Sequence, residues 1–228
     1  MERPSLAIVI PARNEAPRLP SVLDTLPGSL PGVGAILVVV VDDGSHDETV
    51  ACARERGARV ARHVVNLGKG AALRTGCEAA LRLGADLIIA MDADGQHQAA
   101  DLPRLVAPLL AGEADVVLTY REATGGTMPA VLKFGNRALS STLKVMFGVD
   151  IRDTQCGLRA FTSDAYARLR WEARDYSVES EMLVRMARNH LRYVEVPIAT
   201  VYADRYKGTQ PIDGVKILGQ LLRLRFGG

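Results

Sequence analysis

The stretch Leu87-Ile88-Ile89-Ala90-Met91-Asp92-Ala93-Asp94-Gly95-Gln96-His97 decides the fold class of this 228-residue chain. Its five apolar residues without a polar break are typical of a strand buried on both faces of a parallel sheet. Asp92 and Asp94 follow at once, and with one residue between them they can turn to the same side. Two carboxylates at the end of a strand suit Mg²⁺ or Mn²⁺ bound together with substrate phosphates. The stretch therefore predicts chemistry on a nucleoside diphosphate.

Two alternatives exist for this acidic stretch. An ordinary turn after a strand has the same composition, because Asp and Gly favour turns. A calcium-binding EF-hand loop also begins this way, but it needs Glu at its twelfth position and a helix before it. Position twelve counted from Asp92 is Pro103, and a strand comes before. We reject the EF-hand, while the plain turn stays open on these residues alone.

Apolar runs and helical patterns alternate through the first 120 residues. Such alternation predicts an α/β fold with a mostly parallel central sheet and helices on both faces. The expected strands are Ser5–Ile10, Ala35–Val41, Arg59–Val64, Leu87–Met91 and Asp115–Tyr120, and the expected helices are about 16–25, 47–55, 69–83 and 101–110.

The pattern changes after about residue 120. A basic amphipathic segment, Pro129–Phe147, follows a loop-like stretch. Further helices are expected at Ser163–Leu169 and Ser177–Asn189, and a strand at Arg192–Thr200. We expect residues 1–210 to form one domain and residues 211–228 to carry a C-terminal amphipathic helix at Gly214–Phe226.

Composition excludes several classes of protein. A net charge of +2, from 28 basic and 26 acidic residues, gives no signal for nucleic-acid binding. The odd number of cysteines, three, and their wide spacing argue against a disulfide framework and against a zinc site, and suit a reducing cytosol. No signal peptide and no run of 18 apolar residues is found, so we expect a cytoplasmic protein without a membrane span.

Polar residues follow three of the expected strands. They are Pro11-Ala12-Arg13-Asn14-Glu15, Asp42-Asp43-Gly44-Ser45 and Asp92–His97. In open α/β sheets, ligands bind beyond the carboxyl ends of the strands, so the three stretches should converge on one site. Asp42 or Asp43 could accept hydrogen bonds from a base or a ribose. Ser45 with Glu48 fits a capping box for the next helix, which would leave both aspartates for a ligand.

The stretch Asn66-Leu67-Gly68-Lys69-Gly70 looks like a phosphate cradle but lacks the spacing of a P-loop. Gly68 and Gly70 would still allow a ligand close to the backbone at a helix start. Lys69 is unfavourable there for the helix macrodipole, which favours a role in ligand binding.

Five motifs in this order and spacing resemble family 2 glycosyltransferases of the dolichyl/polyprenyl-phosphate mannosyl- or glucosyltransferase branch. The resemblance covers about residues 5–210. It implies a GT-A-type nucleotide-sugar-binding fold, a divalent Mg²⁺ or Mn²⁺ cofactor and inversion at the anomeric carbon. Residues 1–120 would then form the nucleotide-sugar-binding half and residues 121–210 the acceptor half. The motifs are Ile10–Glu15, Val41–Ser45, Asn66–Gly70, Asp92–His97 and Asp153–Arg159.

The resemblance also implies roles for the donor side. Asp92, Asp94 and Gln96 would hold the metal, with Asp94 also counted as catalytic, and Asp42 would hold the base or ribose. Arg205 or Lys207 would reach the diphosphate from a mobile loop. The remaining nucleotide-sugar-binding positions would be Pro11, Ala12, Arg13, Glu15, Asp43, Lys69 and Ala93. The chain departs from the family at Arg13, where an aromatic residue is frequent.

On the acceptor side, Arg121 and Arg137 match catalytic arginines that bind the acceptor phosphate, and Ser141 matches their neighbour. A lipid phosphate has a second pKa near 6 and attacks without a general base, whereas a sugar hydroxyl acceptor needs one. Glu179 and Glu181 are the nearest candidates for such a base. They lie two apart on a predicted helix, so at most one faces the site.

The expected activity is transfer of mannose from GDP-mannose to dolichyl or polyprenyl phosphate. Glucosyl transfer from UDP-glucose, extension of a saccharide, and a nucleotide-sugar-binding module without catalysis are the alternatives. We expect a peripheral protein on the cytoplasmic face of the membrane, with a possible membrane-protein partner in place of the C-terminal membrane helices of many family members. The segment 129–147 could rest on the lipid surface or pack into the core.

Overall fold

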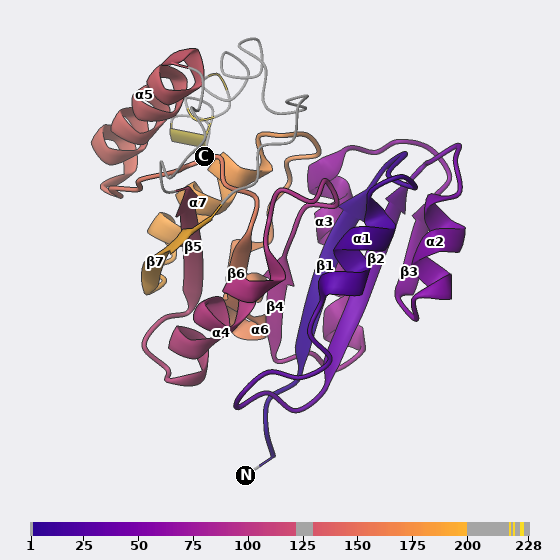
Figure 1. The fold of residues 1–228 in the computed structure, drawn as a ribbon. Coiled ribbons are helices and arrows are strands. Elements are labelled where there is room, and N and C mark those ends of the chain that lie inside the picture. The colour runs from indigo at the N-terminus through magenta and orange to yellow at the C-terminus, as the bar shows by residue number, and fades with distance from the viewer. Residues whose placement is uncertain (1, 122–129, 200–218, 220, 222–223, 226–228) are drawn as a thin grey trace.

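The computed structural model describes residues 2–121 and 130–199 and, near the C-terminus, residues 219, 221, 224 and 225 (Figure 1). Side chains are described from residue 139 onward in the helix that begins at Ala130. A seven-stranded sheet forms the centre of this part of the chain. Its strands are β1 (Leu6–Ala12), β2 (Ile36–Asp43), β3 (Arg59–His63), β4 (Leu87–Ala90), β5 (Val116–Arg121), β6 (Arg159–Thr162) and β7 (Tyr193–Ile198).

The strand order is β3-β2-β1-β4-β6-β5-β7. β6 runs antiparallel to both β4 and β5, and every other neighbouring pair is parallel. The predicted mostly parallel α/β sheet is therefore confirmed, and each of the six expected strands is present within two residues at either end. β6 was not expected, because it is four residues long and begins with the charged Arg159.

Helices cover both faces of the sheet (Figure 1). Side chains alternate along each strand. Ile8 and Ile89 therefore pack on one face with α1 (Leu19–Thr25), α2 (Thr49–Glu55) and α4 (Leu102–Leu110), which a short 3₁₀ turn (Ala99–Asp101) precedes. Val9 and Ile88 pack on the other face. The helices there are α3 (Lys69–Arg82), α5 (Ala130–Phe147), α6 (Ser163–Leu169) and α7 (Val178–Arg188).

The amphipathic helix α5 packs into the core along one side. Leu139 and Leu143 are buried in the cluster on the α3 face, whereas Val145 is 85% exposed. Leu221 is fully buried in the same cluster, and the four described residues near the C-terminus are helical. The rest of the helix expected at Gly214–Phe226 lies outside the described residues. None of the helices in the described part of the chain is long and apolar enough to cross a membrane.

Candidate active site

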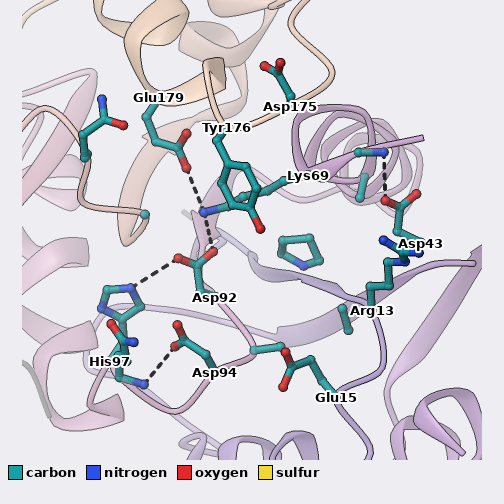
Figure 2. Close-up of a pocket in the computed structure, with 18 of the residues that line it drawn as sticks. Arg13, Glu15, Asp43, Lys69, Asp92, Asp94, His97, Asp175, Tyr176 and Glu179 are labelled. Atoms are coloured by element: carbon teal, nitrogen blue, oxygen red, sulfur yellow. Dashed lines mark hydrogen bonds and ion pairs between the residues drawn. The ribbon is translucent and has the colours of Figure 1, made fainter. Parts of the chain in front are cut away.

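A pocket of about 490 Å³ opens at the edge where β1, β2, β4 and β5 end. The predicted convergence of three polar strand ends is therefore what the structure shows, since residues at or just after the ends of β1, β2 and β4 line one cavity, and Arg121 at the end of β5 joins them (Figure 2). Among the predicted site residues, those that line it are Pro11, Ala12, Arg13, Glu15, Asp43, Lys69, Asp92, Ala93, Asp94, Gln96 and Arg121.

The acidic stretch after β4 forms a tight turn in this pocket. Oδ1 of Asp94 accepts a hydrogen bond from the amide of Gln96 at 3.0 Å, and Gly95 takes a positive φ of 78° between them. Nε2 of His97 lies 3.7 Å from Oδ2 of Asp92 on the far side of the turn (Figure 2). Positive φ is accessible to Gly at little steric cost, so the turn brings both carboxylates to one cavity.

Lys69 lies between two carboxylates of the pocket. Its Nζ is 2.7 Å from Oδ1 of Asp92 and 2.8 Å from Oε1 of Glu179 (Figure 2). Burial opposes the charge on Lys69, but the two carboxylates outweigh it and raise its pKa above the ordinary value. Burial likewise would raise the pKa of Asp92, but the charge of Lys69 and the nearby His97 bring it well below the ordinary value. Both groups are charged at neutral pH.

Gly157 makes room for Asp92. A Cβ atom at residue 157 would lie 2.2 Å from Oδ2 of Asp92, a distance no real side chain allows. The loop after Asp153 therefore approaches the acidic turn closely only because residue 157 has no side chain. The fifth sequence motif thus contributes to the pocket, where Gln155, Cys156 and Gly157 line the wall.

The two aspartates at the end of β2 have different surroundings. Asp42 is fully buried, accepts a hydrogen bond from the amide of Ser45 at 3.1 Å and pairs with Arg62 at 3.1 Å, and it does not line the pocket. Asp42 is thus enclosed by protein, and its expected contact with the base or ribose stays a prediction that the described pocket does not support. Asp43 lines the pocket instead, and it accepts hydrogen bonds from the amides of residues 67 and 68 and pairs with His63 at 2.7 Å.

The expected capping box at Ser45 and Glu48 is not formed. Oγ of Ser45 accepts a hydrogen bond from the amide of Asn14 at 2.9 Å, and α2 begins later, with Glu48 in the N-cap position and no side-chain cap. Ser45 therefore ties the loop after β2 to the loop after β1. The loop after β1 carries the pocket residues Arg13 and Glu15, so this bond fixes that loop relative to the end of β2, where Asp43 lines the pocket.

The glycines flanking Lys69 closely approach protein backbone, so the lack of a side chain at each is needed for packing in this structure. A Cβ at Gly68 would lie 2.2 Å from the carbonyl oxygen of Arg174, and one at Gly70 would lie 2.3 Å from that of Ala173. The amide of Gly70 donates to the Arg174 carbonyl at 2.8 Å. The start of α3 is therefore capped by the segment before α7, and Asn66, Gly68 and Lys69 are the residues of this motif that line the pocket.

Glu179 and Glu181 point in different directions, as expected from their spacing. Glu181 accepts hydrogen bonds from the amides of Glu172 and Ala173 at 2.9 and 2.7 Å and pairs with Arg185 at 2.6 Å. Glu181 therefore holds the chain before α7 and is not among the pocket residues. Glu179 lines the pocket and contacts Lys69.

Arg121, the last residue of β5, lines the pocket and is held by Asp153. Its Nε lies 2.7 Å from Oδ2 and its Nη2 3.0 Å from Oδ1 of that carboxylate. Such a two-point contact fixes the plane of the guanidinium. Asp153 therefore orients Arg121.

Arg159 closes the Asp153–Arg159 motif as a buried structural residue. Its guanidinium donates to the carbonyls of Thr154 and Cys156 and to that of Glu179. Burial lowers its pKa from the ordinary value. Arg159 thus ties the loop after Asp153 to the first turn of α7.

The remaining acceptor-side predictions fall partly outside the described residues. Arg137 lies on α5, where its side chain is not described, and Arg205 and Lys207 lie in the segment 200–218, which is not described. Ser141 is exposed on α5 and is not among the described pocket residues. The structure thus leaves the roles expected for Arg137, Arg205 and Lys207 as predictions.

Sequence reasoning missed Asp175 and Tyr176, which line the pocket from the segment before α7. The ring of Tyr176 lies 5.9 Å from Nζ of Lys69, within reach of a cation–π contact (Figure 2). Its side chain is 48% exposed at the mouth of the cavity. A single Asp-Tyr pair before a helix gives no signal in the sequence, because its place in the site depends on how α7 packs against α3.

The acidic turn has the chemistry of a divalent-metal site. Asp94 and Gln96 offer hard oxygen atoms, and Asp92 is held anionic beside them. The described side chains include no cluster of three or more potential metal ligands. An ion here would therefore take further oxygens from a phosphate ligand or water, as Mg²⁺ commonly does. The residues present fit such an ion, with Asp92, Asp94 and Gln96 as the candidates that would hold it.

Comparison with known proteins identifies the family. Residues 7–169 match the model of glycosyl transferase family 2. This match covers more than half of the chain, so the protein belongs to that family and is a glycosyltransferase.

Two relatives come from the branch that the sequence motifs resemble, which confirms the resemblance. The UDP-N-acetylglucosamine–dolichyl-phosphate N-acetylglucosaminyltransferase of Methanococcus voltae is 31% identical over 96% of this chain and 96% of its own length. The undecaprenyl-phosphate mannosyltransferase of Micrococcus luteus is 33% identical over 90% of this chain and 86% of its own length.

A solved structure confirms the GT-A-like fold. Glucosyl-3-phosphoglycerate synthase of Mycobacterium tuberculosis, crystallised with Mn²⁺, UDP-glucose and phosphoglyceric acid, superposes with a TM-score of 0.74. The match covers 97% of this chain and 79% of that one, at 24% sequence identity. At this identity the comparison supports the fold and leaves the substrates of the present chain to other arguments.

Proposed function

We propose that this glycosyltransferase moves a hexose from a nucleotide sugar to a polyprenyl phosphate, with inversion at the anomeric carbon. The observation that carries the proposal is that the acidic turn Asp92–Gln96 and the oriented guanidinium of Arg121 line one pocket. The first suits the diphosphate of a donor and the second an anionic acceptor. The two named relatives, which act on dolichyl and undecaprenyl phosphate, support the choice of acceptor.

The donor diphosphate gains negative charge as it leaves, so it needs positive charge around it. A divalent cation supplies this neutralisation when it is bound, and we propose Asp92, Asp94 and Gln96 as the residues that would hold it. Lys69 adds a permanent positive charge beside Asp92 at 2.7 Å. Asp43 and the residues after β1 also line the pocket and are our candidates for the nucleoside contacts.

The acceptor phosphate is already anionic at neutral pH, because its second pKa is near 6. It needs cations that bind and orient it, and no base that removes a proton. Arg121 is the described residue suited to this task, and we propose that Arg137 joins it from α5. The lipid tail of such an acceptor lies in a bilayer, so we place the reaction at the cytoplasmic face of the membrane.

The identity of the sugar is the finer part of the proposal. Mannose from GDP-mannose is our first choice, and the relative from Micrococcus luteus supports it. UDP-glucose and UDP-N-acetylglucosamine are the competing donors, the latter because of the relative from Methanococcus voltae.

A transfer assay tests the proposal directly. The protein is incubated with undecaprenyl phosphate in detergent, Mn²⁺ and each radiolabelled donor in turn, and the label is measured in the organic phase. We expect a lipid-linked product with one donor, lost in Asp94→Asn. Label that appears only in water-soluble saccharides would support chain extension instead. No product with any donor would support a binding module.

A further inference from the structure

The side chain of Glu179 has an oxygen atom that the protein does not use. Glu179 is the second residue of α7, lines the pocket and is 5% exposed. Its Oε1 contacts Nζ of Lys69 at 2.8 Å, whereas its Oε2 is buried and has no hydrogen-bond partner in the part of the chain that the structure describes. Native proteins pair nearly all buried polar atoms, so an unpaired one in a substrate pocket marks a place for a ligand.

Glu179 is also held in a fixed position. Its carbonyl oxygen accepts a hydrogen bond from Nη1 of Arg159 at 2.8 Å, which anchors the first turn of α7 to the loop after Asp153. Lys69 holds the side chain through its contact with Oε1 (Figure 2). A group fixed at both its backbone and its side chain is preorganised for a directed contact.

The charges around Oε2 select the kind of ligand. A diphosphate would be repelled by the carboxylate, and a second cation would be repelled by Lys69, whose ammonium already contacts the same carboxylate at 2.8 Å. A neutral hydroxyl group has neither difficulty, and it donates a strong hydrogen bond to a carboxylate. In a nucleotide sugar, the hydroxyl groups outside the nucleoside belong to the sugar.

We propose that Oε2 of Glu179 accepts a hydrogen bond from a hydroxyl group of the donor's sugar and so contributes to the choice of sugar. The inference rests on the proposed function for the nature of the donor, though not for the acceptor. It gives Glu179 a role in sugar recognition in place of the general base that a saccharide-extending enzyme would require. Lys69 then links the sugar contact to Asp92 in the acidic turn.

The test compares binding of a nucleotide sugar with binding of its nucleoside diphosphate alone. Calorimetry with Mn²⁺ is run on the full chain, on Glu179→Ala and Glu179→Gln, and on the control Glu172→Gln. Glu172 is a suitable control because its side chain is 87% exposed and does not line the pocket. The probes are GDP-mannose, UDP-glucose and UDP-N-acetylglucosamine, each beside GDP or UDP.

We expect Glu179→Ala to weaken binding of the nucleotide sugar by about 10- to 100-fold, which is the range for loss of a hydrogen bond to a charged group. Binding of the diphosphate should weaken by less than about 3-fold. Glu179→Gln should show a smaller loss of the same kind. The control should change neither. Equal losses for sugar nucleotide and diphosphate, or no loss, would overturn the inference. A folding defect is recognised separately, because it lowers the measured number of binding sites per chain for both ligands, whereas a lost contact lowers the affinity alone.

Monodeoxy analogues of the preferred donor sharpen the test. Removal of one particular hydroxyl should weaken binding to the unaltered protein and have little further effect in Glu179→Ala or Glu179→Gln. If every deoxy donor loses the same affinity in all three proteins, Glu179 makes no sugar contact. Unchanged binding with a lost turnover in Glu179→Gln would identify a base and also overturn the inference.

These outcomes are separable from failure of the proposed function. If the unaltered protein binds a nucleotide sugar in the predicted manner but makes no lipid product, the role of Glu179 stands and the acceptor is wrong. If it binds no nucleotide sugar, both proposals fail, and the unaltered protein shows this without any variant.

Discussion

Nζ of Lys69 lies 2.7 Å from Oδ1 of Asp92, so the first carboxylate of the acidic turn is paired with an ammonium that comes from the start of α3. The two residues are 23 positions apart in sequence and come from different motifs. Their contact joins the start of α3 to the acidic turn after β4. A cationic residue at the N-terminus of a helix is unfavourable for the helix macrodipole, and the two carboxylates it contacts explain why it is found there.

Replacing Lys69 by Met should lower the free energy of unfolding by about 3 kcal/mol, because it leaves two largely buried carboxylates without their partner. Urea unfolding followed by circular dichroism measures this loss. The matched control is Lys144→Met, which removes an exposed ion pair with Asp150 and should change stability little. Equal effects of the two substitutions would show that the Lys69 pairs contribute no more than a surface contact.

Stability should fall in acid partly because of Asp92. Its pKa lies below the ordinary 3.8 in the folded protein, so the ionised carboxylate stabilises the fold above that pH. This contribution is lost as the pH drops below 3.8, where the unfolded chain binds a proton that the folded one resists. The urea concentration at the midpoint of unfolding should therefore fall less steeply with decreasing pH, between pH 5 and 2, for Asp92→Asn than for the unaltered protein. Parallel curves for the two proteins would contradict the assignment.

A methyl group at position 157 should damage the acidic turn without unfolding the protein. In Gly157→Ala the new Cβ would clash with Oδ2 of Asp92 at 2.2 Å, which forces that carboxylate out of place. We expect kcat/KM for sugar transfer to fall by about 100-fold, because a misplacement of about 1 Å in an active site can cost that much. Gly28→Ala is the control, since nothing lies within 4 Å of its new Cβ. Full activity in Gly157→Ala would show that Asp92 can move freely.

Much of the fold could be predicted from the sequence because its strands are continuous apolar runs. β4 is buried along its whole length, and its pattern alone indicated a central parallel strand. β6 could not be found in this way. It runs antiparallel between β4 and β5, and its first residue, Arg159, is acceptable in the core only because three backbone carbonyls accept its hydrogen bonds. These hydrogen bonds depend on the folded conformation of the loop before β6 and on α7, so they leave no signal in the sequence pattern.

The sequence could predict which pairs of neighbouring residues lie near the candidate site, but not which member of a pair lines the pocket. Asp42 and Asp43 are adjacent acidic residues at the end of one strand, where side chains alternate between opposite sides. The position of Arg62 and the loop after β3 decides that Asp42 is enclosed and that Asp43 lines the pocket. Lys69 was correctly placed in the site, although its contacts with Asp92 and Glu179 depend on the packing of α3 against α7.

Glu181→Gln should weaken the structure and spare the chemistry. Glu181 accepts two backbone amides and pairs with Arg185, so loss of its charge should lower the free energy of unfolding by about 1–3 kcal/mol. Turnover per folded molecule should stay within about 3-fold of the unaltered enzyme, because Glu181 makes these contacts outside the pocket. Thermal unfolding and steady-state kinetics on the same preparation separate the two effects. A stable protein without turnover would return Glu181 to the role of base.

The central claim is that the acidic turn binds a nucleotide sugar together with a divalent cation. Calorimetric titration of UDP-glucose, GDP-mannose and UDP-N-acetylglucosamine into the protein, with Mn²⁺ and then with EDTA, tests it most directly. We predict that one donor binds with Mn²⁺, that EDTA weakens this binding at least about 10-fold, and that Asp94→Asn removes the dependence on Mn²⁺. Donor binding that is equally tight with EDTA and in Asp94→Asn would contradict the account.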